Sequence, residues 1–176
     1  MSTSDTIVTD RLLLIVVGAH LRAEQSDRPL AYRLRERILR WIDGATGADT
    51  AENKAKTTAD TPPPIPPPPP ALLEPLVCTD LWYLNNEELI RRPTITIGAP
   101  GVNACTAFLT QRLPSVFVID DTLQVLMDPE LTTLHACCWG VDQSATVSAV
   151  DLFAERFLDR FLNVSLGRDP DAPSPE

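Results

Sequence analysis

Apolar residues along the chain fall into short runs that end at glycine turns or pass into amphipathic stretches. Residues 11–18, RLLLIVVG, form a continuous apolar run closed by glycine, typical of a strand buried on both faces of a parallel sheet. Residues 94–97 alternate polar and β-branched side chains, and Gly98 to Gly101 then form a tight turn. Apolar residues at helical spacing follow from Val102. This stretch is predicted to be a strand, a glycine turn and a helix.

A second unit of the same kind is predicted near the start, with residues 11–18 as the central strand of the sheet. Ser26 or Asp27 is a suitable helix N-cap, and Pro29 is tolerated in the first helical turn. Gly44 is expected to end this helix. If the strands of the two units are parallel, their loops open at the same edge of the sheet.

The second half of the chain adds further strands and helices. Asn85 or Asn86 could cap a single helical turn. Asp121 and Thr122 form so short a link between two apolar strands that only an antiparallel hairpin can use it. The predicted elements are strands at 76–80, 115–120, 123–128 and 134–139, a helical turn at 87–90 and a helix at 146–162.

These elements predict an α/β fold: a single three-layer domain with a Rossmann-like mixed sheet of five or six strands and helices on both faces. A proline-rich tract, with five consecutive prolines at 66–70, is predicted to be an inserted polyproline II spacer. A binding site for a proline-reading partner is the alternative. The predicted divisions are a disordered start at 1–10, one domain from 11–44 and 74–166, a spacer at 45–73 and a disordered tail at 167–176.

The net charge of −9 disfavours nucleic acid and anionic membranes as partners, because both require a basic surface. The first residues lack the basic start and apolar core of a secretory signal, and no apolar run is long enough to span a bilayer. The four cysteines lack CxxC spacing, which favours buried thiols over a zinc site. We therefore expect an acidic cytoplasmic protein that binds another protein, with no metal or cofactor, and the sequence leaves its oligomeric state open.

Three predicted strand-to-helix loops, 18–27, 98–103 and 140–146, share one edge of the sheet, where open α/β sheets bind ligands. The GAPGVN turn has neither GxGxxG spacing nor the following Lys and Ser/Thr of a Walker turn. Structural roles are the alternative: glycines for positive φ or close approach, and Asn103 bonding backbone groups of its turn. The candidate ligand-binding residues are Gly98, Gly101, Asn103, Asp142, Thr146, His20 and Asp80.

Neither histidine belongs to a nucleophile motif with Ser or Cys, so we predict no catalytic residue. Trp82 and Tyr83 are candidates for partner binding, because rigid aromatic side chains carry a large share of interface energy. Trp139 is expected near the same edge. The alternative is that these aromatic residues belong to the core.

Residues 94–114, TITIGAPGVNACTAFLTQRLP, resemble the strand-GGPxVN-helix unit of the Rossmann-like domains in archaeal surface-layer proteins, with Ala99 in place of a glycine. Residues 139–158, WGVDQSATVSAVDLFAERFL, resemble the closing unit of those domains, in the same order. The resemblance implies a scaffold or assembly domain without catalytic residues, in which Asn103 and Thr146 fix the two loops. Surface-layer proteins are exported and this chain shows no signal, so only the fold is carried over.

Two functions are therefore expected. The first is a non-enzymatic protein-interaction or scaffold module of Rossmann-like fold. The alternative is a small-molecule or phosphate-binding protein or enzyme that uses the Gly98–Asn103 turn as an anion cradle, with His20 or Asp80 as acid or base.

Overall fold

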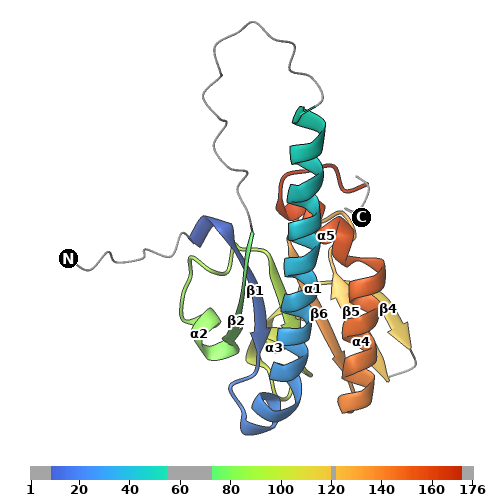
Figure 1. The fold of residues 1–176 in the computed structure, drawn as a ribbon. Coiled ribbons are helices and arrows are strands. Elements are labelled where there is room, and N and C mark those ends of the chain that lie inside the picture. The colour runs from blue at the N-terminus through green and yellow to red at the C-terminus, as the bar shows by residue number, and fades with distance from the viewer. Residues whose placement is uncertain (1–8, 55–72, 120–121, 172–176) are drawn as a thin grey trace, which may run out of the picture.

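The computed structural model describes residues 9–54, 73–119 and 122–171, and for Thr9 and residues 46–54 only the backbone. Six strands form one mixed sheet in the order β2-β1-β3-β6-β5-β4 (Figure 1). Strands from both sides of the proline-rich tract belong to this sheet, so the fold is the predicted α/β domain. The strands are β1 (Leu12–Val17), β2 (Glu74–Thr79), β3 (Thr94–Ile97), β4 (Ser115–Ile119), β5 (Leu123–Met127) and β6 (His135–Gly140).

The sheet is parallel on one side and antiparallel on the other. β2, β1, β3 and β6 are parallel neighbours, so their carboxyl ends lie at one edge. β5 is antiparallel to both β6 and β4, and β4 and β5 form the predicted hairpin. β1 is the second strand from one side, so the prediction that it is central was wrong. It is nevertheless buried along its whole length, because it has a neighbour on either side and helices on both faces.

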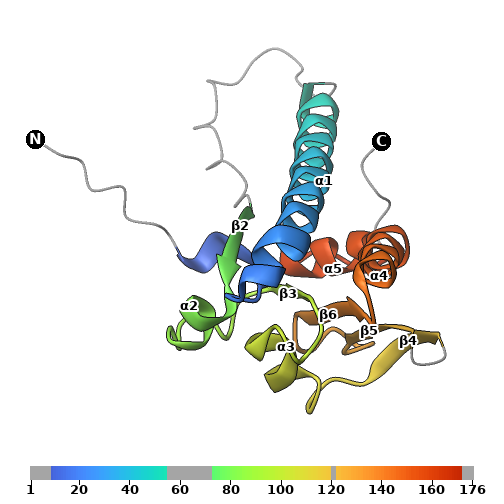
Figure 2. The same cartoon turned by 90° about the horizontal axis from the view of Figure 1, so that it is seen from below.

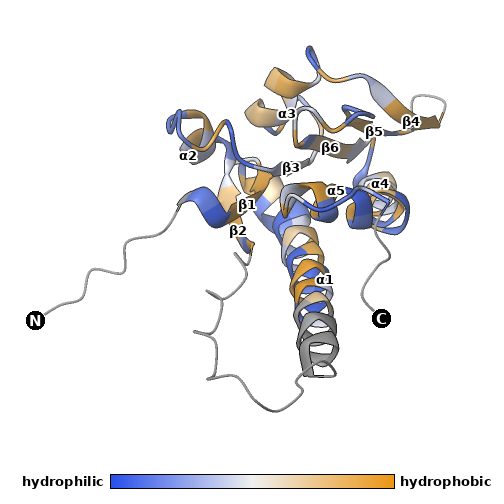
Figure 3. Ribbon diagram, turned by 90° about the horizontal axis from the view of Figure 1, so that it is seen from above, coloured by the Kyte–Doolittle hydropathy of each residue, from blue (hydrophilic) through white to orange (hydrophobic). Residues whose placement is uncertain are grey.

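Helices cover both faces of the sheet, with α1, α4 and α5 on one face and α2 and α3 on the other (Figure 2). Apolar residues dominate the strands, whereas the coloured part of α1 carries both apolar and polar residues (Figure 3). The helical elements are η1 (Thr9–Arg11), α1 (Leu21–Lys54), α2 (Asp80–Leu84), α3 (Ala104–Leu109), α4 (Gln143–Arg156) and α5 (Leu158–Ser165).

The sheet separates two hydrophobic cores. Ile15, Phe153 and Phe161 belong to the larger core, under α1, α4 and α5. Leu14 and Tyr83 belong to the smaller core, under α2 and α3. Successive residues of β1 point alternately to the two cores, which is why the strand must be apolar at every position.

The first helix begins earlier than predicted, at Leu21, so that Ser26 and Asp27 lie inside it and Pro29 is an interior proline. His20 caps its start: the ring Nδ1 accepts a hydrogen bond from the Arg22 N–H at 3.2 Å, and the carbonyl accepts from the Glu24 N–H at 3.1 Å. Pro29 has no N–H to donate to the preceding turn. The apolar stripe packed on the sheet compensates for that loss; it comprises Leu30, Ala31, Leu34, Ile38 and Ile42.

The first helix also ends later than predicted, at Lys54 instead of Gly44. An interior glycine costs only about 1 kcal/mol relative to alanine, and the next residue, Ala45, is buried. The rest of the predicted spacer, residues 55–72, lies outside the described residues, as do 1–8, 120–121 and 172–176. At the predicted disordered ends, residues 9–11 form η1 and residues 167–171 contain turns.

Two further elements differ from prediction. α2 follows β2 without a loop, with the Thr79 hydroxyl accepting from the Trp82 N–H at 3.4 Å, whereas residues 87–90 form only turns. The last helix begins after its N-cap Asp142 and breaks at Phe157, where φ is −124°. Phe153 and Phe161 lie on either side of the break, and their rings pack edge to face with centroids 5.9 Å apart. Both α4 and α5 therefore remain packed on the core. No helix in the described part of the chain has an apolar stretch long enough to cross a bilayer.

Candidate functional site

The carboxyl edge of the parallel strands gathers the loops that follow β1, β2, β3 and β6. This edge is where open α/β sheets bind ligands, at the point where consecutive connections leave in opposite directions. Here that point lies between β1 and β3, because the chain passes from β1 to β2 on one side and returns to β3 on the other. The prediction that the three loops share one edge is confirmed.

Asp80 is buried at this edge and links three segments. Its Oδ1 accepts hydrogen bonds from the N–H groups of Ala19 at 2.9 Å and Leu81 at 2.8 Å, and its Oδ2 accepts from Ala104 at 2.7 Å. The carboxylate thus satisfies donors at the start of α2 and α3 and in the loop after β1. An external anion at the start of α3 would compete with this internal carboxylate.

Asn103 is fully buried and holds β1, β3 and α3 together. Its amide nitrogen donates to the carbonyls of Val16 at 3.1 Å and Ile97 at 2.9 Å. Its Oδ1 accepts from the N–H groups of Cys105 at 3.0 Å and Thr106 at 3.2 Å, as an N-cap. The predicted bond from Asn103 to the backbone of its turn is therefore present, and the side chain has no free hydrogen-bonding atom for a ligand.

The loops that follow β1 and β3 meet through a backbone contact, which closes the gap between them. A Cβ atom added at Gly18 would lie 1.9 Å from the carbonyl oxygen of Val102, so only glycine allows the two loops to meet. Gly98 has a positive φ of 107°, which also requires glycine. Gly101 has neither constraint and is exposed, with nothing within 4 Å of an added Cβ. The expected structural role therefore holds for Gly98 and not for Gly101.

A shallow cleft of about 480 Å³ remains above the closed gap, lined by His20, Leu81 and Pro100 among others. His20 is exposed, and its Nδ1 is used as the cap of α1. Small and apolar side chains form most of the remaining lining, and Asp80 and Asn103 are satisfied within the protein. The cleft therefore offers a surface for apolar contact more than a set of polar groups for a ligand.

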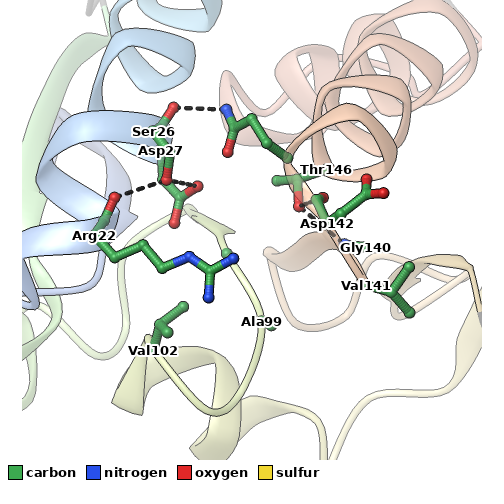
Figure 4. Close-up of a pocket in the computed structure, with 11 residues that line it drawn as sticks. Arg22, Ser26, Asp27, Ala99, Val102, Gly140, Val141, Asp142 and Thr146 are labelled. Atoms are coloured by element: carbon green, nitrogen blue, oxygen red, sulfur yellow. Dashed lines mark hydrogen bonds between the residues drawn. The ribbon is translucent and has the colours of Figure 1, made fainter.

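A second, smaller hollow of about 80 Å³ lies between α1 and the loops after β3 and β6 (Figure 4). The Thr146 hydroxyl accepts from the Gly140 N–H at 3.1 Å and donates to the Asp142 carbonyl at 2.9 Å, as predicted for the backbone of this loop. The Asp142 carboxylate accepts from the Ala145 N–H at 2.8 Å, and this bond lowers the pKa of Asp142. Of the predicted candidates, Gly98, Asp142 and Thr146 line this hollow, whereas Gly101, Asn103, His20 and Asp80 line the cleft.

The small hollow is also lined by two charged residues that were not among the predicted ligand-binding candidates, Arg22 and Asp27. Asp27 is 5% exposed and accepts from the Ser26 hydroxyl at 3.0 Å. Burial raises the pKa of Asp27, opposed in part by that hydrogen bond and by the charge of Arg22. Figure 4 shows the Arg22 side chain extending into the hollow beside Asp27. A helix start at Leu21 would have placed Asp27 on the buried stripe, four residues after Ala23.

The aromatic candidates occupy different environments. Trp82 is 44% exposed on α2, whereas Tyr83 is fully buried in the smaller core and accepts from the Thr94 hydroxyl at 3.4 Å. The prediction of Tyr83 as a partner-binding residue was therefore wrong, because adjacent residues on a short helix point in different directions. Trp139 is half-buried on β6, and its Nε1 has no hydrogen-bond partner among the described residues.

The cysteines and His135 have structural surroundings and form no ligand set. The four cysteines are free and buried, and desolvation raises the pKa of Cys137 to about 12, which keeps the thiol protonated. His135 bonds to the Ile90 carbonyl at 2.9 Å, and burial lowers its pKa. Among the described residues, no three His, Cys, Asp or Glu side chains are grouped as metal ligands would be.

No family model matches the chain, and neither the curated proteins nor the solved structures include a match.

Proposed function

We propose that this protein is a non-enzymatic interaction or scaffold module that docks another protein at the carboxyl edge of its sheet. The observation that carries the proposal is the internal saturation of the Gly98–Asn103 turn by Asp80 and Asn103. A phosphate cradle needs several free backbone N–H groups pointing at one place. Here the first three N–H groups of α3 all donate to those two side chains, which disfavours the alternative of an anion site at this turn.

The same edge exposes large apolar side chains. Leu81, which lines the shallow cleft, is 56% exposed, and Leu21, which directly follows the lining residue His20, is 71% exposed. Trp82 adds a third exposed side chain next to Leu81. Apolar residues concentrated around a cleft are typical of surfaces that bind other proteins. The resemblance to scaffold domains of surface layers supports the same class of function.

The proposal extends to location. Four free, buried cysteines support a reducing compartment such as the cytoplasm. The net charge of −9 supports a protein partner over nucleic acid or an anionic membrane. We retain cytoplasmic location and a protein partner as parts of this proposal.

Site-specific photocrosslinking tests the docking surface. We expect a photoreactive amino acid at Leu81 to capture one defined partner in the source cell. The same group at Tyr32, which is 48% exposed on α1, should not capture it. Trp82→Ala should keep the fold, costing about 1 kcal/mol or less because the side chain is exposed, and should reduce the capture at Leu81. Equal capture at both positions would contradict the proposal.

A small-molecule arm tests the alternative function. Inorganic phosphate, ATP and NAD should cause no saturable change in the backbone amide NMR signals of residues 101–104. Saturable shifts there, or turnover of any of these compounds, would move the assignment to a phosphate-binding protein or enzyme.

A second candidate function rests on Asp27. A buried carboxyl group beside an arginine in a cleft is characteristic of functional sites. The hollow of about 80 Å³ has room for only a very small polar ligand or a few water molecules. A small ligand at this point would shift the amide signals of Gly98 and Gly140 and leave those of residues 101–104 unchanged.

A further inference from the structure

A groove on the α2 side of the molecule combines an apolar floor with an acidic rim. It has a volume of about 410 Å³, and we call it the Trp82 groove. Leu12 and Leu89 are almost completely buried and Leu76 is half-buried, so these leucines form its floor. Its defining residues are Leu12, Leu76, Leu89, Trp82, Glu87 and Glu88.

The rim of the Trp82 groove carries a net negative charge. Glu87 and Glu88 are exposed, and neither takes part in any of the three ion pairs found among the described residues. Arg91 and Arg92 line an adjoining hollow with them, but Arg92 pairs with Asp10. With one exposed arginine against two glutamates, the region remains acidic.

A third carboxylate adds to this field. Glu74 is exposed and is aligned with Leu12 across the β1–β2 pair, so its side chain lies on the same face of the sheet as the groove floor. The whole chain is also acidic, with a net charge of −9. Together these charges attract a cationic partner before contact.

We propose that the Trp82 groove binds an arginine side chain in a basic segment of the partner protein. The alkyl part of arginine lies on the leucine floor, its guanidinium stacks on the exposed face of Trp82, and Glu87 and Glu88 accept its hydrogen bonds. Arginine fits better than lysine, because a planar guanidinium both stacks on aromatic rings and forms forked bonds to carboxylates. This inference rests on the proposed function and specifies the chemistry of the partner.

Titration with a hexa-arginine peptide, acetylated and amidated at its ends, tests the inference. Binding is followed by calorimetry at about 50 mM salt, where charge attraction is still strong. The indole Nε1–H NMR signal of Trp82, assigned with Trp82→Phe, should shift during the titration. Hexa-lysine of the same charge should bind about threefold to tenfold more weakly, because it loses the stacking and the forked bonds.

Two double variants with the same net charge separate the groove from general attraction. Glu87→Gln with Glu88→Gln should weaken hexa-arginine binding about tenfold. Glu130→Gln with Glu155→Gln removes two exposed carboxylates elsewhere and should change it less than twofold. Both pairs are exposed, so neither change is expected to unfold the protein.

Any of four results would overturn the inference: no hexa-arginine binding, equal weakening in the two double variants, an unshifted Trp82 signal, or equally tight binding of hexa-lysine. If Leu81 still captures a partner by crosslinking in any of these cases, the docking function stands and only its arginine chemistry is rejected.

Discussion

Replacement of Asn103 by alanine tests whether this side chain holds the carboxyl edge together. The variant removes two donors from the carbonyls of Val16 and Ile97 and the acceptor for two N–H groups of α3. Loss of a helix N-cap costs about 1 kcal/mol. Each buried carbonyl left without its partner adds about 1 kcal/mol or more. We therefore expect a loss of about 3 to 5 kcal/mol, a large part of the stability of a domain of this size.

Urea unfolding followed by circular dichroism at 25 °C measures the effect. Asn103→Ser keeps an acceptor at the cap and loses the amide donors, so it should fall between wild type and Asn103→Ala. Asn85→Ala is the matched control, since the Asn85 amide donates to the Leu81 carbonyl at 2.8 Å on the exposed side of α2. It should cost less than about 1 kcal/mol. A loss below about 1 kcal/mol for Asn103→Ala, with an unchanged denaturant slope, would refute the reasoning.

Three further predictions concern buried groups. Burial raises the pKa of Asp27, so its contribution to stability is complete below the unfolded value of 3.8 and declines as pH rises through the folded pKa. In urea unfolding, Asp27→Asn should therefore gain stability relative to wild type as the pH rises from 3.5 to 7. A loss of stability relative to wild type over the same pH range would contradict the raised pKa. Gly18→Ala forces a Cβ against the Val102 carbonyl and should lower the melting temperature by several degrees, whereas Gly101→Ala should change it little. Equal shifts in melting temperature would contradict the close approach of Gly18 and Val102. The four cysteines, with a pKa of about 12 at Cys137, should resist a thiol reagent in the native protein and all react in urea; rapid native labelling would show that they are accessible.

The strands and their common edge were predictable from the sequence because their signals are local. The run at residues 12–17 is apolar at every position, and the glycines after β1 and β3 mark where each strand stops. Asn103 and Thr146 could be assigned to loop backbone because short polar side chains at helix starts commonly bond there.

The start of α1 was not predictable in the same way. His20 caps this helix through its ring nitrogen, and histidine is not among the residues that mark helix starts. Pro29 suggested a first turn, but packing of the apolar stripe on the sheet supports it in the interior. The error hid Asp27, which is buried only when the helix begins at Leu21.

The environments of Trp82 and Tyr83 depended on tertiary contacts that no local pattern encodes. α2 has five residues, too few for a hydrophobic period to show which side faces the core. Its start was also hidden, because β2 passes into the helix without a glycine or an extended polar loop. The groove beside Trp82 depends in addition on Leu12 and Leu76, which come from two different strands.

The position of Asp80 also has a meaning for how this fold could change. One carboxylate satisfies backbone donors from three segments that are far apart in the sequence. A single replacement of this residue by a smaller one would release all three donors toward one point at the edge of the sheet. The geometry of all three segments therefore depends on one side chain, and a change at Asp80 would affect the loop after β1 and the starts of α2 and α3 together.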